Sequence, residues 1–427
     1  MRKYTQLGLV VVCVVSVMGL LIMERQYSNM KVFLEVTDIF QTSESNAKCV
    51  RQLESLRATL EGEYLDTIHK VDPSWDQIGM STFLYSSFYA PASQLVTILL
   101  VSDVRPKTCR LWLDPDTSQT VEASVEVLAS SSSFSALAVG CINPNNSTRP
   151  QAVEIFGSIV PIEEQLVHDP HHVGICVHPL TFNTTEVKLA EFLAYHSHIG
   201  VDRFYVYDAN LSPQAKTFVR RAPYIQPDLI THLLQWNAPV SIGSLSEPIL
   251  KADCLLRAGL DSKYVAMLSI NEFFVLRRKM ANMTAFLATV IHDDQVLAVH
   301  ERTFCDEYPD DVIASALKYP FSTLRKTKFN KNTKQHRVTF VPAGNLTNLA
   351  SLAHSGVTRA EETSFVSEET AHMNVYTSCA GMHNYLRKKN LQIPTDTFLT
   401  GFHEQLFGSK LYKFTLHRKS PVYHLIA

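Results

Sequence analysis

The chain has 427 residues, of which 46% are hydrophobic and 19% are charged, and its formal net charge is -2. This length exceeds one average domain and suits two domains with accessory segments. A net charge near zero argues against a nucleic-acid-binding protein, which would present a strongly basic face. The two short basic runs, 277–279 and 387–389, are interpreted as solvated surface.

The N-terminus contains an uncharged apolar run, Leu7 to Met23, that follows Arg2 and Lys3. At about 1.5 Å per residue, the run reaches the lower limit for crossing a bilayer. Positive charge before the run predicts a cytoplasmic N-terminus. We therefore expect a cytoplasmic tail (1–6) and a transmembrane signal anchor (7–23), with a cleaved signal peptide as the alternative.

Sequons and cysteines agree with a lumenal location for the rest of the chain. The sequons begin at Asn145, Asn146, Asn183, Asn210, Asn282 and Asn345. Apart from Cys13 in the apolar run, the cysteines are Cys49, Cys109, Cys141, Cys176, Cys254, Cys305 and Cys379. In an oxidising lumen they can form disulfides, but an odd number leaves one over, and the pairing stays open. Together with the anchor, these features fit a single-pass type II protein of the Golgi or ER membrane.

The segment 24–75 has the composition of a stem. Leu53, Leu56 and Leu60 would share one helical face. A homodimer formed through the stem stays open, because the pattern is too short to predict a coiled coil.

A β-rich module is predicted over residues 76–165. Its strands are rich in β-branched and aromatic residues, and prolines, aspartates and serines separate them, as in an antiparallel sheet. The expected strands are 82–89, 94–101, 110–113, 121–127 and 134–141.

From residue 166 to 427, strands and helices alternate, which predicts an α/β domain with a mostly parallel sheet and helices on both faces. Expected strands are 173–177, 203–207, 229–235, 264–274, 296–299, 337–340 and 373–376. Expected helices are 184–199, 212–220, 247–259 and 398–407. For the first helix, Asn183 is the expected N-cap, Glu186 the N3 residue and Gly200 the C′ residue.

Ligands of such sheets lie at the carboxyl ends of the strands. Three polar clusters are expected there: His178-Pro179-Leu180, Asp208-Ala209-Asn210 and Ser269-Ile270-Asn271-Glu272. An acidic side chain at a strand end can bind a ribose hydroxyl, although the Asp208 cluster also has the composition of a plain turn.

Metal ligands are sparse in this pattern. Ser269 and Asn271 would supply uncharged oxygens, and Glu272 is the one carboxylate of its stretch, so divalent metal affinity should be weak. His196 and His198 are two apart on a predicted helix and cannot form a metal pair. The sequence contains no glycine-rich phosphate loop.

Several segments, in order, resemble glycosyltransferase family 92. Residues 174–180 resemble its opening strand, and 191–208 (EFLAYHSHIGVDRFYVYD) its most recognisable signature. Residues 254–257 (CLLR) and 269–273 (SINEF) resemble its Cys-x-x-Arg and Asp-Ile-Asp-Glu-Phe segments. The likeness spans about residues 76 to 420.

The resemblance implies a GT-A fold and an inverting transfer of a hexose, usually galactose, from a UDP-sugar donor to a hydroxyl of a glycan acceptor. It implies a divalent metal such as Mn²⁺, with Ser269 and Asn271 at the metal-binding positions beside Glu272 and a loosely aligned His354. Candidate donor-binding residues are His178, Pro179, Asp208 and Asn210.

Two departures from the family pattern matter. Both aspartates of the metal motif are replaced, by Ser269 and Asn271, and a late His-Tyr-Arg reads Val375-Tyr376-Thr377. The general base of an inverting transfer is left open among Asp306, Glu307, Asp310 and Asp311. The alternative function is a catalytically inactive family member that binds a glycan or a partner protein in the lumen.

Overall fold

The computed structural model describes residues 74–114, 116–145, 148–163, 173–277, 283–292, 295–330, 336–343, 363–380 and 393–419. The described residues belong to one compact unit, Asp72–Ala427. The expected tail, anchor and nearly all of the stem lie outside the described residues. Among the described helices, none is long and apolar enough to cross a membrane.

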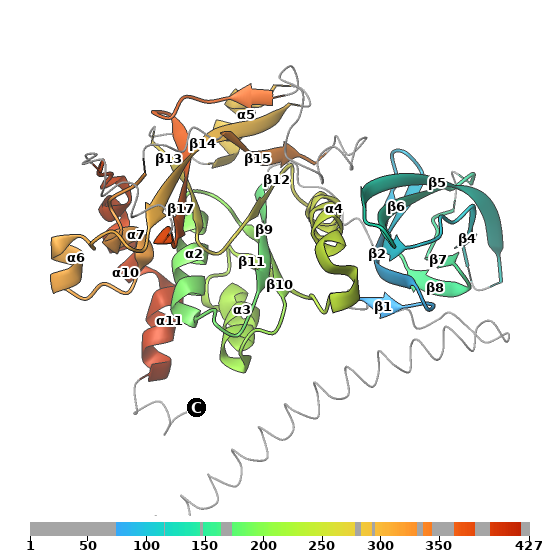
Figure 1. Ribbon diagram of the computed structural model, residues 1–427, viewed down its shortest axis with the longest axis horizontal. Helices are drawn as coiled ribbons and strands as arrows, with labels where there is room; N and C mark the ends of the chain where they lie inside the picture. Colours follow the sequence, from blue (N-terminus) through green and yellow to red (C-terminus); the bar gives the residue numbers. More distant parts are fainter. Residues whose placement is uncertain are drawn as a thin grey trace, which may run out of the picture. The chain divides into compact units, whose positions relative to one another are not determined.

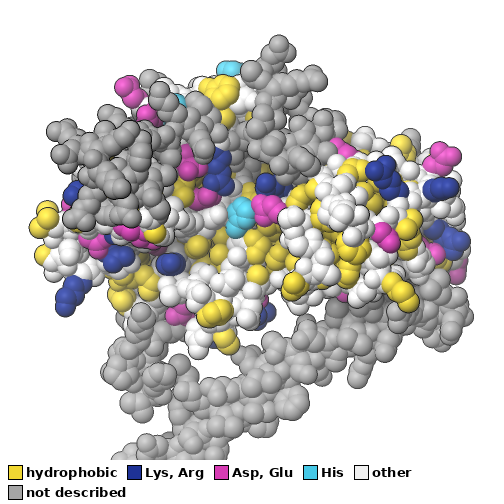
Figure 2. Space-filling model, in the orientation of Figure 1, with side chains coloured by type: hydrophobic (Ala, Val, Ile, Leu, Met, Phe, Trp, Pro, Cys, Tyr) yellow, Lys and Arg dark blue, Asp and Glu magenta, His cyan; other side chains and the backbone are white. Residues whose placement is uncertain are grey.

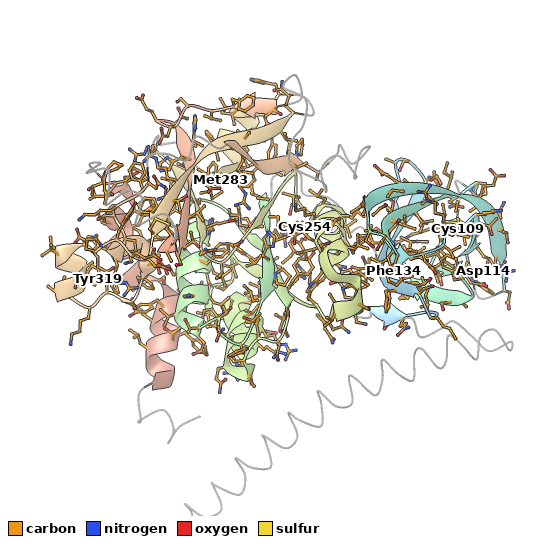
Figure 3. All side chains as sticks on the ribbon, viewed as in Figure 1. Cys109, Asp114, Phe134, Cys254, Met283 and Tyr319 are labelled. Carbon is orange, nitrogen blue, oxygen red and sulfur yellow. A yellow bond between two sulfur atoms is a disulfide. The ribbon has the colours of Figure 1, made fainter. Side chains whose placement is uncertain are left out.

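The N-terminal part of the described unit is an antiparallel eight-stranded sheet with the order β1-β2-β3-β6-β5-β4-β7-β8 (Figure 1). The strands are β1 (Asp76–Gln77), β2 (Thr82–Ala90), β3 (Leu95–Ser102), β4 (Thr108–Trp112), β5 (Ser118–Ser130), β6 (Ser135–Ile142), β7 (Ala152–Ile155) and β8 (Ser158–Pro161). All five predicted strands are confirmed, because their branched side chains fill a core of their own. Cys109 on β4 forms a disulfide with Cys141 on β6 (Figure 3).

The second sheet has nine strands. Eight follow the order β11-β10-β9-β12-β15-β14-β17-β13, and β16 pairs with β14. The strands are β9 (Val173–Leu180), β10 (Arg203–Asp208), β11 (Ile230–Gln235), β12 (Tyr264–Leu268), β13 (Glu272–Leu276), β14 (Val296–Cys305), β15 (His336–Pro342), β16 (Thr363–Phe365) and β17 (Ala371–Thr377). Strands β11, β10, β9 and β12 are parallel, whereas β15 and β13 pair antiparallel with their neighbours, so the sheet is mixed.

Helices cover both faces of this sheet. They are α2 (Glu186–His198), α3 (Pro213–Ile225), η1 (Val240–Leu245), α4 (Ser246–Ala258), α5 (Met283–Val290), α6 (Val312–Ala316), α7 (Ser322–Arg325), η3 (Phe398–Phe402), α10 (His403–Gly408) and α11 (Lys410–Lys419). Alternate residues of β9 pack against α2 and α3, while Cys176 faces α4 on the other side and forms a disulfide with Cys254. Figure 1 shows α4 between the sheet and the β-rich module.

The parallel strands and most helices confirm the predicted alternation, with local corrections. His178-Pro179-Leu180 belongs to β9 and not to a loop, because β10 pairs with β9 as far as Leu180 across an irregularity. The N-cap of α2 is Thr185, whose side chain accepts from the Lys188 amide, so Glu186 is at N1 and Asn183 lies outside the helix. Gly200 does follow the helix with a φ of 101°, as the predicted C′ residue.

Two predicted elements are divided. The expected strand 264–274 ends at Leu268, and Glu272 begins a separate strand, β13, that pairs with β17. The expected C-terminal helix 398–407 consists of η3 and α10, and α11 follows it.

A buried ionic cluster joins the β-rich module to the second sheet. Asp253 on α4 is 0% exposed and accepts from Arg257 (2.8 Å), Ser86 on β2 (2.7 Å) and Tyr207 on β10 (2.6 Å). Arg257 also pairs with Glu163, which follows the module. These contacts pair the buried Asp253 with Arg257 and connect the module to α4.

Candidate active site

The strand ends that carry the candidate residues meet at one edge of the second sheet. The strand β15 runs antiparallel to both β12 and β14, so β14 runs in the same direction as β12, and β17 is parallel to β14. The carboxyl ends of β9, β10, β12, β14 and β17 therefore lie at a common edge, which we call the carboxyl edge. This is where ligands of open α/β sheets bind.

A short turn, Ser269 to Asn271, connects β12 with β13 at the carboxyl edge. The Glu272 carboxylate stabilises this turn, because its Oε2 accepts from the Ser269 backbone N–H at 2.8 Å. The side-chain nitrogen of Asn271 donates to the Tyr376 carbonyl at 2.6 Å, and the Tyr376 N–H donates to the Asn271 carbonyl at 3.0 Å. Asn271, at one of the two motif positions, thus fixes the turn to β17.

Arg337, at the start of β15, forms an ion pair with the other oxygen of Glu272, Oε1. The Glu272 side chain is 8% exposed and that of Arg337 is 29% exposed, so the guanidinium reaches solvent while its partner is covered. One carboxylate therefore holds both the Ser269 backbone and the Arg337 guanidinium.

Further charges lie next to this pair. His178 on β9 interacts electrostatically with Glu272 and Arg337 and lies 3.9 Å from Glu247 on α4, which pairs with Lys251 one turn later at 3.6 Å. Burial lowers the pKa of His178, against the carboxylates that raise it. Figure 2 shows a histidine flanked by acidic and basic side chains on the face in view.

Glu301 on β14 also interacts electrostatically with Arg337 and Glu272. Burial raises the pKa of the Glu301 carboxyl, and the guanidinium of Arg337 opposes that rise. The carboxyl edge thus combines three acidic and two basic side chains in a mixed-charge cluster.

Asp208 and Asn210 lie at the end of β10. Asp208 Oδ1 accepts from the backbone N–H groups of Asn210 (3.0 Å) and Leu211 (2.6 Å), and Oδ2 pairs with Lys216 at 2.8 Å. Asn210 is exposed at a φ of 90°, a conformation that asparagine tolerates. The contacts are those of a turn before a helix, which agrees with the plain interpretation of this segment.

The four general-base candidates follow β14 and differ in their partners. Asp311 caps α6, and Asp310 pairs with Lys326 at 2.8 Å. Glu307 accepts from Ser378 Oγ at 2.5 Å and from the Cys379 N–H at 2.8 Å. Asp306 is exposed, and its backbone N–H donates to the Thr377 carbonyl at 3.0 Å.

The described residues do not fit a divalent metal at the positions of the family motif. Both oxygens of Glu272 have partners, Asn271 directs its amide nitrogen to a carbonyl, and Ser269 offers a hydroxyl, whereas magnesium-like ions at phosphates require one or two carboxylates. His354, the loosely aligned fourth ligand, lies outside the described residues.

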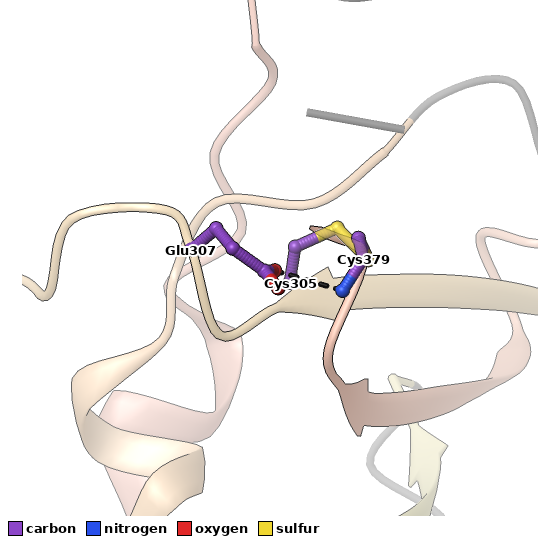
Figure 4. Close-up of side chains that lie close together, drawn as sticks. All are labelled: Cys305, Glu307 and Cys379. Atoms are coloured by element: carbon purple, nitrogen blue, oxygen red, sulfur yellow. Dashed lines mark hydrogen bonds between the residues drawn. A yellow bond between two sulfur atoms is a disulfide. The ribbon is translucent and has the colours of Figure 1, made fainter. Parts of the chain in front are cut away.

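One group of potential ligands does come together in the described part of the chain: Cys305, Glu307 and Cys379 (Figure 4). Cys305 and Cys379 form a disulfide, so neither sulfur is a thiolate. The group is a structural link between the ends of β14 and β17.

The helix histidines have the structural roles expected of them. His196 is 0% exposed, and its Nδ1 lies 2.9 Å from the Phe192 carbonyl while its Nε2 accepts from the Phe274 N–H. Burial lowers the pKa of His196 to about 3, so the ring is neutral. His198 is exposed and packs edge-on against Phe402.

Arg337, Glu247 and Lys251 were not identified from the sequence. Glu247 and Lys251 had a signal, because they begin a predicted helix that leaves the carboxyl edge and are spaced i, i+4. Arg337 had none, since its place depends on β15 inserting antiparallel between β12 and β14.

Comparison with known proteins identifies the class. The model of glycosyltransferase family 92 matches residues 171–378, which include the carboxyl edge described above. The match covers just under half of the chain, so residues 171–378 are similar to glycosyltransferase family 92, and this similarity supports a glycosyltransferase. No curated protein matches the sequence.

Solved structures with some likeness include TarS 1–349 of S. aureus, at 13% identity and a TM-score of 0.27 over 59% of this chain and 77% of that one. The bifunctional glycosyltransferase WbbM in its apo form is 12% identical, at a TM-score of 0.23 over 45% of this chain and 31% of that one. HddC from Yersinia pseudotuberculosis is 11% identical, at a TM-score of 0.24 over 57% of this chain and 99% of that one. Likenesses this distant carry no argument about the chemistry.

Proposed function

We propose that the protein transfers a hexose from a UDP-sugar to a glycan hydroxyl, with inversion at the anomeric carbon. Galactose is the expected hexose, because it is the one that the family usually transfers. The observation that carries the proposal is the family 92 match across a carboxyl edge that presents charged, solvent-reaching side chains. We propose that the domain has the GT-A-like fold expected for this function. The resemblance to family 92 implies a divalent metal such as Mn²⁺, for which the described residues offer no ligand set.

In this proposal the donor lies along the carboxyl edge, with its diphosphate at the turn 269–271. The nucleotide then extends over the ends of β9 and β10, toward His178, Pro179, Asp208 and Asn210. Asp208 can contact a ribose hydroxyl while keeping its present bonds, because an ionised carboxylate accepts about four hydrogen bonds.

Asp306 is the best placed of the four general-base candidates. Backbone hydrogen bonds connect Asn271 to Tyr376, and the Thr377 carbonyl to Asp306, so β17 separates the donor turn from Asp306. Two strand spacings are about 10 Å, a separation that a sugar ring lying over the end of β17 can span. Glu307, Asp310 and Asp311 bind other parts of the protein.

The reaction then needs no covalent intermediate. Asp306 takes the proton of the acceptor hydroxyl as that oxygen attacks the anomeric carbon from the face opposite the diphosphate. The bond between the anomeric carbon and the phosphate oxygen breaks, and UDP leaves with the electron pair. Basic side chains at the edge stabilise the charge of the leaving diphosphate.

We further propose that the domain faces the Golgi lumen behind the N-terminal anchor. Support comes from the apolar run after Arg2 and Lys3, the sequons, and three disulfides in the described unit. Disulfides form and persist in secretory compartments. Asn183 is an exposed sequon residue.

The replacement of both metal-motif aspartates favours one alternative, a non-catalytic protein that binds a glycan or a partner in the lumen. The two functions differ in nucleotide binding and turnover. We would incubate the purified chain with a panel of UDP-sugars and measure released nucleotide, comparing wild type with Asp306→Asn. The enzyme predicts release from at least one donor and a loss of about 10²- to 10⁴-fold in the variant. Release from no donor of the panel would favour the alternative.

A further inference from the structure

The charge balance at the donor turn differs from that of a metal-dependent site. A pair of aspartates at 269 and 271 would carry two negative charges, which a divalent cation neutralises before a diphosphate can approach. Here both positions are neutral, and the remaining carboxylate, Glu272, is paired with Arg337. The turn therefore reaches the same local neutrality without a metal ion.

Arg337 supplies a positive charge next to the donor turn. Glu272 holds the Ser269 N–H with one oxygen and the guanidinium with the other, so the two lie on opposite sides of a single carboxylate. Nη1 is the donor that binds Glu272. A guanidinium has five N–H donors in a planar fork, which leaves donors to bind a phosphate.

The burial of the pair favours this orientation. Glu272 is covered at 8% exposure, while Arg337 is 29% exposed, so the carboxylate positions the arginine and the arginine faces solvent. Arginine paired to a fixed carboxylate loses little further conformational entropy when it binds an anion.

We propose that the donor diphosphate binds without a divalent metal, with Arg337 contacting it in the metal's place and Glu272 acting as the positioning residue. This inference rests on the proposed function, because it concerns the same donor. Lys251 adds positive charge to the edge, whereas Glu247 and Glu301 add negative charge, and Glu301 also interacts electrostatically with Arg337.

The test measures UDP affinity of the purified chain by titration calorimetry in excess EDTA and in excess Mn²⁺. Three variants are compared with wild type. Arg337→Gln removes the charge, Arg337→Lys keeps it without the fork, and Arg110→Gln removes an arginine from a surface ion pair with Glu154 in the β-rich module. Thermal unfolding of each variant without ligand checks that it is folded.

We expect equal UDP affinity in EDTA and Mn²⁺, a loss of about 10- to 100-fold for Arg337→Gln, a smaller loss for Arg337→Lys, and none for Arg110→Gln. If Arg337→Gln does not fold, the test uses Arg337→Lys, which should bind UDP more weakly than wild type. Binding that requires Mn²⁺ overturns the inference and leaves the proposed function standing, as does metal-free binding that Arg337→Gln and Arg337→Lys keep at full strength. Absence of binding to every nucleotide of a panel under both conditions overturns the proposed function itself.

Discussion

Two arginine–carboxylate pairs in the same unit show how burial separates a structural pair from a pair available to a ligand. Arg257 and Asp253 are 6% and 0% exposed, and Ser86, Tyr207 and Glu163 complete their hydrogen bonds. Arg337 and Glu272 are 29% and 8% exposed, and the arginine reaches solvent at the carboxyl edge. The first pair closes an interface inside the protein, and the second presents a positioned cation.

Removing the closed pair should cost the most stability. Asp253→Ala leaves Arg257 buried with one carboxylate fewer, and breaking a buried pair costs about 3–5 kcal/mol. We expect a matching fall in the free energy of unfolding by urea denaturation. A loss below about 1 kcal/mol would contradict the description of this cluster as the connection between module and sheet.

Acid should destabilise the protein through the buried His196. His196 is neutral in the fold with a pKa of about 3, whereas an unfolded histidine titrates near 6.5. The stability it contributes is complete above pH 6.5 and is lost as the pH falls toward 3, by about 2 kcal/mol at pH 5. Urea denaturation at pH 7.5 and pH 5 measures the loss, and His196→Gln should flatten it; an unchanged slope in that variant would contradict the assignment.

Restoring the family residue at the donor turn should be unfavourable by itself. Asn271→Asp would set a carboxylate 2.6 Å from the Tyr376 carbonyl, where the amide nitrogen now donates. The lost hydrogen bond and the repulsion of two acceptors should lower the unfolding free energy by about 1–2 kcal/mol. Asn271→Ser, which removes the bond without adding charge, is the control, and it should lose less than the aspartate variant.

The smallest effect is expected for the surface pair in the β-rich module. Arg110 and Glu154 lie 3.3 Å apart with the arginine about half exposed, so Arg110→Gln should change stability by about 0–1 kcal/mol. A larger loss of stability would contradict the expectation that exposed ion pairs stabilise the protein less than buried ones.

The local parts of the fold were predictable from the sequence. The parallel strands, the helix starting at Glu247 and the strands of the β-rich module follow hydrophobic period and turn chemistry, which act within a few residues. The cap of α2 was placed wrongly, because Asn183, Thr184 and Thr185 can all cap a helix and only the packed backbone selects Thr185.

The position of the candidate residues in the sheet was predictable, but the residues that contact them were not. The strand-end rule led to Ser269, Asn271 and Glu272, whereas Arg337 lies 65 residues from its partner Glu272. Its place depends on an antiparallel insertion that no local pattern encodes. For the same reason the Glu307 carboxylate was predicted as a candidate base, although it binds Ser378 and Cys379 across 71 and 72 residues.

The most direct test of the account is nucleotide release from a UDP-hexose panel by the purified chain in excess EDTA, compared with the same reaction in Mn²⁺. The account predicts release from at least one donor, at similar rates in both conditions, and its loss in Asp306→Asn while UDP binding is retained. Release from no donor in either condition would contradict the central claim that the carboxyl edge of this family 92 domain is a working active site.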